Sequence, residues 1–231
     1  MNTVVDRSLL QSATPFVECG LLARDGLDVN DEVIRTSSVS RYGQHDTVFF
    51  EGDQADSMCQ VVEGAVMLYK LLPDGRRQVV ELLGPGDIFG FAQGQYRDTS
   101  AETLNVTRVR FYDRRHADRS CSFQRVLARQ MLAQLEAMHE HAVLLGRMSA
   151  MERVARFLLR LAAHVTEETD DPSVIRLAMT RQEIADYLGL TIETVSRSFS
   201  ELRRRGVIVL EKQDRVRIAN QRAMEDLAIA C

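Results

Sequence analysis

The sequence lacks several features that would assign it to a special class of protein. No apolar run approaches the roughly 20 residues of a bilayer-spanning helix, and the N-terminus has no charged segment followed by an apolar one, as a secretion signal would. Only 13 glycines and 4 prolines occur in 231 residues, which excludes a collagen-like or low-complexity chain. We therefore expect a globular, cytoplasmic protein that does not associate with membranes.

Cysteine is scarce and scattered. Cys19, Cys59, Cys121 and Cys231 lie far apart in the chain, and no two of them form a C-x-x-C pair. Disulfide-rich domains and sequence-local zinc sites both need closely spaced ligands. The sequence therefore indicates free thiols, and we expect no metal.

An excess of basic residues is missing as well. The chain has 29 Lys and Arg against 33 Asp and Glu, a net charge of -4, whereas phosphate contacts need Lys and Arg. The acidity is uneven, because residues 148–231 hold 13 basic and 13 acidic side chains. Charge alone does not establish a nucleic-acid-binding protein.

Residues 37–121 have the pattern of an antiparallel β domain, after an N-terminal arm at 1–36 that shows no clear period. Turns containing glycine separate short apolar runs at 47–50, 61–69, 79–83 and 106–112. Pro73-Asp74-Gly75 is a typical turn, because proline fixes φ and glycine accepts a positive φ. Several short strands at this spacing predict a sandwich or roll.

After residue 122 the apolar period changes to 3.5, which predicts one long helix up to residue 148. Such a stripe packs either against the core of its own domain or against the same helix of a second chain. We favour the second alternative, a homodimer, and expect Gln134, Glu136 and Glu140 on exposed faces off the stripe. The predicted dimer interface consists of Ala128, Met131, Leu135, Met138, Ala142 and Leu145.

The region 146–150 predicts a break, followed by a second amphipathic helix at 151–164. An acidic stretch with one proline at 167–172 is expected to be an exposed loop.

The segment 180–204 contains the signals of two short helices separated by a tight turn. Thr180 and Glu183 have capping-box spacing, Gly189 supplies a left-handed stop, and Thr191 caps a second helix. With the small Ala185 at the crossing, this is the helix-turn-helix pattern. Two apolar strands within 206–218 predict a β wing.

These elements predict an α+β chain in four segments: arm 1–36, β-roll 37–121, dimerisation helix 122–148 and winged helix-turn-helix domain 149–231. No nucleophile–base pair, metal cluster or phosphate loop occurs at a meaningful spacing, so the sequence does not indicate an enzyme.

Residues 179–199 resemble the helix-turn-helix of the CRP/FNR transcription regulators. The resemblance extends over the β-roll, which is similar to cyclic-nucleotide-binding domains, the long helix and the junction at 145–158. Glu193-x-x-Ser196-Arg197 is the form of the FNR and FixK branches, and the chain is most similar to the FixK branch. The CRP branch has arginine at the place of Ile192 and glycine at that of Ser196.

The resemblance implies how such a protein binds double-stranded DNA. Glu193 would accept a hydrogen bond from cytosine N4, and Arg197 would donate hydrogen bonds to guanine O6 and N7. Ser196 would form a hydrogen bond or contact a thymine. Ile192 completes the base-reading set. The phosphate-contacting set is Thr180, Arg181, Gln182, Thr191 and Thr194. The three arginines at 203–205 either make further phosphate contacts or only interact favourably with the dipole at the C-terminus of their helix.

The operator implied by the resemblance is a palindrome of TTGAT and ATCAA half-sites separated by about four base pairs. A homodimer would then place its two recognition helices about 34 Å apart.

The ligand chemistries of the family do not match the roll. Cyclic-nucleotide binders carry Gly-Glu-Leu and Arg-Ser, where this chain has Gly90-Phe91-Ala92 and Thr99-Ser100, although Arg97 lies nearby. An iron–sulfur cluster needs four thiolates, and only Cys19 lies in the N-terminal region that supplies three of them. No sequence context typical of a haem ligand surrounds any of the five histidines, His45, His116, His139, His141 and His164.

The resemblance therefore implies an activator of microaerobic or nitrogen-fixation genes that works without a cofactor and contacts RNA polymerase. The alternative is a regulator gated by an unidentified small molecule, haem or a redox signal. The turn at 73–77, with Arg76 and Arg77, is either a polymerase contact or an ordinary hairpin.

Overall fold

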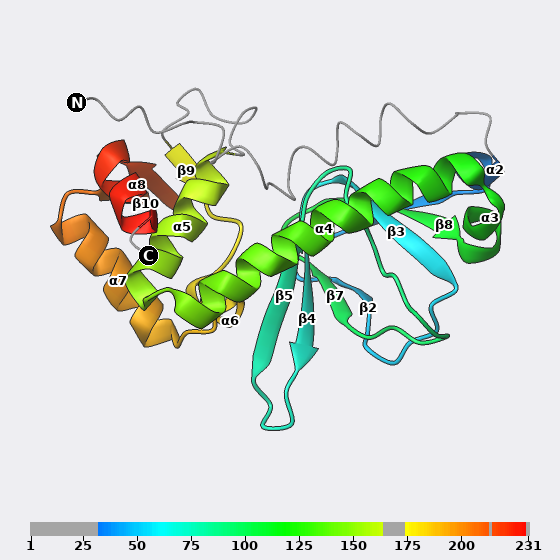
Figure 1. Cartoon of the computed structure of the whole chain (residues 1–231), viewed down its shortest axis with the longest axis horizontal. Helices are drawn as coiled ribbons and strands as arrows, with labels where there is room; N and C mark the ends of the chain where they lie inside the picture. Colours follow the sequence, from blue (N-terminus) through cyan, green and yellow to red (C-terminus); the bar gives the residue numbers. More distant parts are fainter. Residues whose placement is uncertain (1–31, 164–173, 213, 230–231) are drawn as a thin grey trace. The chain divides into compact units, whose positions relative to one another are not determined.

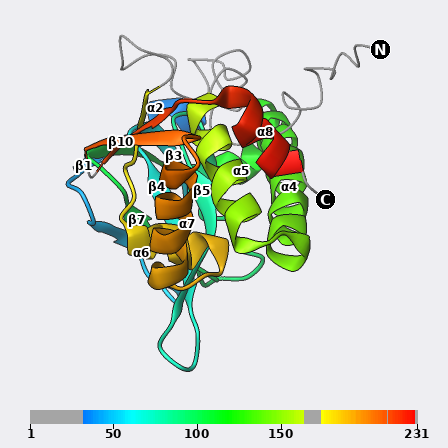
Figure 2. The same ribbon diagram turned by 90° about the vertical axis from the view of Figure 1, so that its left-hand side faces the viewer.

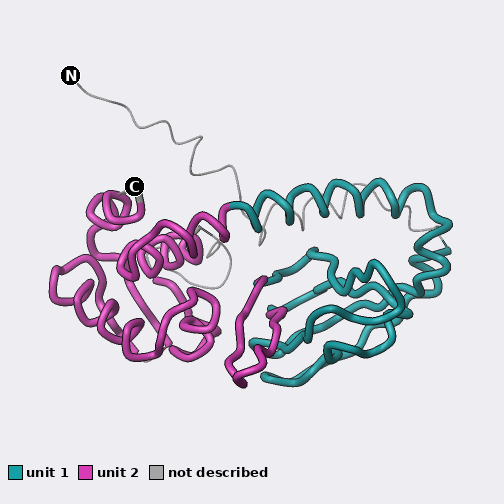
Figure 3. The backbone as a smooth tube through the Cα atoms, turned by 60° about the horizontal axis from the view of Figure 1, so that its bottom comes forward, with its two compact units in different colours: residues 1–66, 82–139 teal, residues 67–81, 140–231 magenta. Residues whose placement is uncertain are grey.

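The computed structural model describes residues 32–163, 174–212 and 214–229 (Figure 1). Most of the predicted arm and the acidic segment 167–172 lie outside these residues. The chain forms two compact units, residues 1–66 with 82–139 and residues 67–81 with 140–231 (Figure 3). Among the described residues, no helix combines the length and the apolarity needed to cross a membrane.

The region of the predicted β domain is built on antiparallel strands, as expected, and residues 67–81 within it belong to the second unit. One sheet has the order β1-β8-β3-β6, with β1 at Ser38–Tyr42, β8 at Thr107–Asp113, β3 at Ser57–Glu63 and β6 at Ile88–Phe89. The other has the order β2-β7-β4-β5, with β2 at Thr47–Phe49, β7 at Ser100–Thr103, β4 at Val66–Leu71 and β5 at Arg77–Leu83. These sheets form the predicted roll.

The apolar run 61–69 contributes to two strands, β3 and β4. Gly64 lies between β3 and β4 with a φ of +89°. A Cβ atom at this position would come within 2.6 Å of the Val106 carbonyl oxygen. Only glycine accepts this backbone conformation without strain, so the run divides into two strands.

The core of the first unit lies where the helices meet β8. Two short helices, α2 (Glu32–Arg35) and α3 (Arg114–Arg119), accompany the long helix α4 (Cys121–Arg147). Tyr112 and Phe123 pack edge to face with ring centroids 4.9 Å apart. The Tyr112 hydroxyl donates to Gln60 Oε1 at 2.6 Å, which satisfies the polar end of a fully buried ring.

Gln134 corrects the expectation that it would lie on an exposed face of α4. Its side chain is buried and its Nε2 donates to the Ile88 carbonyl at 3.0 Å. One turn earlier, Gln130 donates to the Gly86 carbonyl at 3.1 Å. The two glutamines therefore bind main-chain carbonyls around β6, which need hydrogen-bond partners once they are buried.

The second unit contains the C-terminal elements. Helix α5 (Ala150–Ala163) is followed by α6 (Arg181–Leu188) and α7 (Ile192–Arg204). A further helix, α8 (Gln221–Ile229), packs beside α5 (Figure 2). The sequence reasoning missed this last helix. A three-stranded sheet has the order β10-β11-β9, with β10 at Ile208–Lys212, β11 at Arg215–Ile218 and β9 at Val174–Arg176. Its β10–β11 hairpin is the predicted wing.

Candidate nucleic-acid interface

Helix α6 begins with the predicted capping box. The backbone N–H of Glu183 donates to Thr180 Oγ1 at 3.2 Å, and Glu183 Oε2 accepts from the Thr180 backbone N–H at 2.7 Å. Two N-terminal amides that the helix leaves unpaired are thereby satisfied. Ile184, Ala185 and Leu188 are fully buried, as expected, so α6 is anchored by its apolar face.

The turn between the two helices also has the predicted chemistry. Gly189 adopts a φ of +60°, and its N–H donates to the Ala185 carbonyl. The Thr191 hydroxyl accepts from the Thr194 N–H at 3.3 Å and so caps α7. Val195 and Phe199 fill the core below α7, which leaves the opposite face of the helix free to contact a ligand.

The four predicted base-reading residues lie on that exposed face. Ile192, Glu193, Ser196 and Arg197 occupy the first two turns of α7, and all four are exposed. Their side chains combine one apolar group, one acceptor, one hydroxyl and one guanidinium, which is a set able to discriminate base edges.

Two further residues share this face and were missed by the sequence reasoning. A shallow depression of about 470 Å³ is lined by Ser196, Arg197, Ser200, Glu201 and Arg204. Ser200 lies one helical turn beyond Ser196 and Glu201 lies one turn beyond Arg197, so helical spacing alone would have found both.

Hydrogen bonds at the N-terminus of α7 favour the ionised form of Glu193. Its own backbone N–H, and then the Thr191 hydroxyl, hold the pKa of Glu193 below its usual value, with a smaller contribution from Arg197. Further along, hydrogen bonds from Arg204 and Arg205 lower the pKa of Glu201 to about 2. These two arginines of the cluster 203–205 therefore carry an acidic partner on the same helix.

The predicted phosphate-contacting residues lie at the N-terminal ends of the two helices. Thr180, Gln182 and Thr191 are exposed, and Thr191 and Thr194 share a hydrogen bond of 3.1 Å between their hydroxyls. Arg181 is half-buried because its guanidinium lies over the Phe199 ring. Helix N-termini attract anions through their unpaired N–H groups, so both ends suit a phosphate backbone.

In the first unit, Arg97 turns away from solvent. Its guanidinium donates to the carbonyls of Gly90 and Ser57, the latter at 2.6 Å, and lies 4.3 Å from the Phe49 ring centroid. A Cβ atom at Gly90 would collide with Arg97 Nη1, so glycine at this position makes room for the guanidinium. Arg97 is the basic residue that lies near the expected cyclic-phosphate position in the sequence. Its guanidinium is already hydrogen-bonded to main-chain oxygens.

The described cysteines and histidines occupy different environments. Cys59 is fully buried and burial raises the pKa of its thiol to about 12, whereas Cys121 is exposed. His141 stacks on Tyr187 with ring centroids 4.3 Å apart, and burial lowers its pKa to about 4. Cys19, Cys231 and His164 lie outside the described residues.

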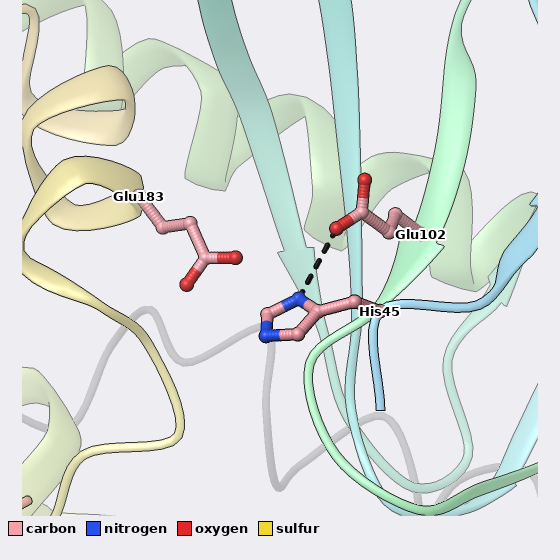
Figure 4. A group of neighbouring side chains, drawn as sticks. All are labelled: His45, Glu102 and Glu183. Carbon is pink, nitrogen blue, oxygen red and sulfur yellow. Dashed lines mark hydrogen bonds and ion pairs between the residues drawn. The ribbon is translucent and has the colours of Figure 1, made fainter. Parts of the chain in front are cut away.

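His45, before β2, lies within hydrogen-bond distance of Glu102 of β7 (Figure 4), with 3.2 Å between His45 Nδ1 and Glu102 Oε1. Figure 4 also labels Glu183, whose carboxylate takes part in the capping box of the second unit.

Comparison with known proteins accounts for both parts of the chain. Residues 152–227 match the model of the Crp-like helix-turn-helix domain, and residues 39–122 match that of the cyclic nucleotide-binding domain. The nitrogen fixation regulation protein FixK of Rhizobium meliloti is 38% identical over 82% of this chain and 86% of its own length. The chain belongs to the CRP/FNR family.

Two further relatives place this CRP/FNR regulator within the family. The transcriptional activatory protein AadR of Rhodopseudomonas palustris is 37% identical over 87% of this chain and 85% of its own. The structure of FixK2 from Bradyrhizobium japonicum superposes with a TM-score of 0.77 and 34% identity, covering 85% of this chain and 99% of that one. Among the branches of the CRP/FNR family, this regulator is most similar to FixK.

Proposed function

We propose that this CRP/FNR regulator binds TTGAT and ATCAA palindromes as a homodimer, without a cofactor, and activates microaerobic or nitrogen-fixation genes through RNA polymerase. The observation that carries the proposal is the exposed face of α7, which presents Glu193, Ser196 and Arg197 together. The names of its relatives, a nitrogen fixation regulator and a transcriptional activator, support the choice of genes and the direction of control.

The chemistry of α7 favours these half-sites. A charged Glu193 accepts from the N4 amine of cytosine, a donor that guanine and thymine do not offer in the major groove. Arg197 donates two hydrogen bonds to guanine, and Ile192 or Ser196 contacts a thymine methyl group. A G·C pair flanked by A·T pairs satisfies all these groups, and the half-site TTGAT has this composition.

The exposed apolar face of α4 supports the homodimer. Five of the six predicted interface residues are exposed and Leu145 is half-buried. Met131, Leu135 and Met138 leave 50%, 49% and 55% of their surface accessible in the single chain. A contiguous apolar stripe of this kind is typical of a helix that pairs with a second helix.

Binding without a cofactor is supported by the interior of the first unit, where Arg97 already bonds to the carbonyls of Gly90 and Ser57. A ligand phosphate would have to displace these bonds. The proposed division of the chain is arm 1–36, β-roll 37–121, dimerisation helix 122–148 and DNA-binding domain 149–231. The residues proposed to contact DNA phosphates are Thr180, Arg181, Gln182, Thr191 and Thr194.

The test is DNA binding by the purified protein with no additive. Fluorescence anisotropy at fixed, near-physiological salt would compare a labelled TTGAT–ATCAA palindrome with a scrambled duplex of equal composition. Specific complexes of such proteins exceed non-specific ones by about 10³-fold or more, and we expect a preference of this order. A preference that emerges only after addition of a nucleotide, haem or a reductant would favour the gated regulator instead.

A further inference from the structure

An ion pair joins two elements of the second unit that lie far apart in the sequence. Arg77 Nε, on β5, lies 2.9 Å from Asp186 Oδ2, on α6, across 109 residues of chain. The two side chains are only 23% and 10% exposed. The neighbouring pair of Arg76 with Asp74 stays within the hairpin turn and is 77% and 51% exposed.

Both partners of this ion pair are held by further contacts. The Arg77 guanidinium lies over the Tyr69 ring, 5.3 Å from its centroid. The other carboxylate oxygen of Asp186 accepts from Gln182 Nε2 at 2.7 Å. Charges that are shielded from water interact more strongly than exposed ones, and a fixed geometry reduces the entropy lost in forming the pair.

The same side of the hairpin reaches the C-terminal end of α6. Gln78 Nε2 is 3.5 Å from the Tyr187 carbonyl, and its Oε1 is 4.0 Å from where a Cβ atom of Gly189 would lie. Arg153 of α5 donates to the Leu188 carbonyl at 2.9 Å and to the Leu145 carbonyl at 2.8 Å. The end of α6 is therefore fixed by polar side chains from β5 and α5.

A displacement of α6 would be passed on to α7. Arg181, the first residue of α6, lies over Phe199 in the middle of α7, and the Leu190 N–H in the turn donates to the Ala185 carbonyl at 3.0 Å. The two helices thus behave as one body. Bidentate recognition of a base fails when the donor groups move by about an ångström, so the orientation of this body matters for DNA binding.

We propose that Arg77 is a positioning residue for DNA recognition, whose ion pair with Asp186 holds the helix-turn-helix against the β4–β5 hairpin in the orientation that binds DNA. This inference rests on the proposed function. It also supplies a physical reason for binding without a ligand, because a contact built into the chain fixes the orientation. Arg77 accordingly differs from Arg76 in role, although the two are adjacent in the same turn.

The test uses four variants of the full chain. Arg77→Gln removes the ion pair, and Arg76→Gln is the matched control, with the same change of charge at the adjacent exposed position. Asp186→Asn, alone and combined with Arg77→Gln, completes a double-mutant cycle. Hydrogen–deuterium exchange of the amides in 181–188 would be measured without DNA, and anisotropy would give the affinity for the palindrome.

For Arg77→Gln we expect faster exchange in α6 and at least about fivefold weaker operator binding, the lower range of typical coupling effects. Arg76→Gln should change neither quantity, and the double variant should bind no worse than Arg77→Gln alone. The inference is overturned if Arg77→Gln matches Arg76→Gln, or if exchange rises while affinity stays the same. If the wild-type chain does not select the palindrome, the proposed function fails, and the exchange data alone then decide whether the ion pair holds α6.

Discussion

The guanidinium carbon of Arg181 lies 3.6 Å from the centroid of the Phe199 ring, so the first residue of α6 is stacked on the middle of α7. Burial lowers the pKa of Arg181, but a guanidinium remains charged at any physiological pH. The stacking holds this charge beside the N-terminus of α6. This position makes the guanidinium suited to a DNA phosphate.

Arg181→Ala is expected to weaken binding to the palindrome and to random duplex by the same factor. Removing one phosphate contact lowers the electrostatic part of the affinity, which carries no sequence information. In anisotropy titrations at several salt concentrations, the slope of log K against log salt should become shallower by about 1. Arg222→Ala on α8 is the control, and an unchanged slope for Arg181→Ala would argue against the phosphate role.

Arg197→Ala is expected to act differently, because its guanidinium is assigned to a guanine. Affinity for the palindrome should fall by about 1–3 kcal/mol, while binding to random DNA changes little. Competition with operators changed at a single base pair should show relaxed specificity at one position in each half-site. Equal losses on the palindrome and on random DNA would remove Arg197 from the base-reading set.

Leu135→Glu is expected to dissociate the proposed homodimer, because it places a charge in the middle of the apolar stripe on α4. Sedimentation velocity would show a shift from dimer to monomer, with a parallel loss of palindrome binding. Arg129→Gln, with the same change of charge on an exposed position outside the stripe, should leave the dimer intact. A monomeric wild-type protein that still selects the palindrome would contradict the prediction.

Glu81, on β5, is expected to make stability depend on pH. Burial raises its pKa from 4.5 to about 7, and its Oε1 has no hydrogen-bond partner among the described residues. Well below pH 4.5 the carboxyl is protonated in both the folded and the unfolded chain, so burying it costs no folding stability through ionisation. As the pH rises to 7, the unfolded chain releases the proton first, so folding stability falls and then levels off.

Glu81→Gln should therefore stabilise the protein at pH 8 by up to about 3 kcal/mol more than it does at pH 4.5. Urea denaturation at the two pH values measures this difference. Glu136→Gln, at an exposed position on α4, is the control. A stabilisation by Glu81→Gln that is equal at both pH values would mean that Glu81 ionises normally in the folded chain.

Local signals made the helix-turn-helix predictable. The capping box of Thr180 and Glu183, the left-handed Gly189 and the cap at Thr191 each act within four residues, and the structure has all three. The division of the apolar run 61–69 into two strands could not be predicted, for the complementary reason. An apolar run does not reveal the backbone conformation of the glycine within it, which is set by contacts with the loop at 105–107.

The sequence by itself determined the elements of the DNA-binding motif, their order and the chemistry of the face that α7 exposes, because caps, turns and helical periodicity depend on near neighbours. Only the tertiary structure decided which polar side chains are engaged inside the protein. Gln134 binds the Ile88 carbonyl, Arg97 binds that of Gly90, and Arg77 pairs with Asp186. Each of these partners is chosen by the packing of separate elements, and burial then makes the contact necessary because a polar group removed from water must find a partner.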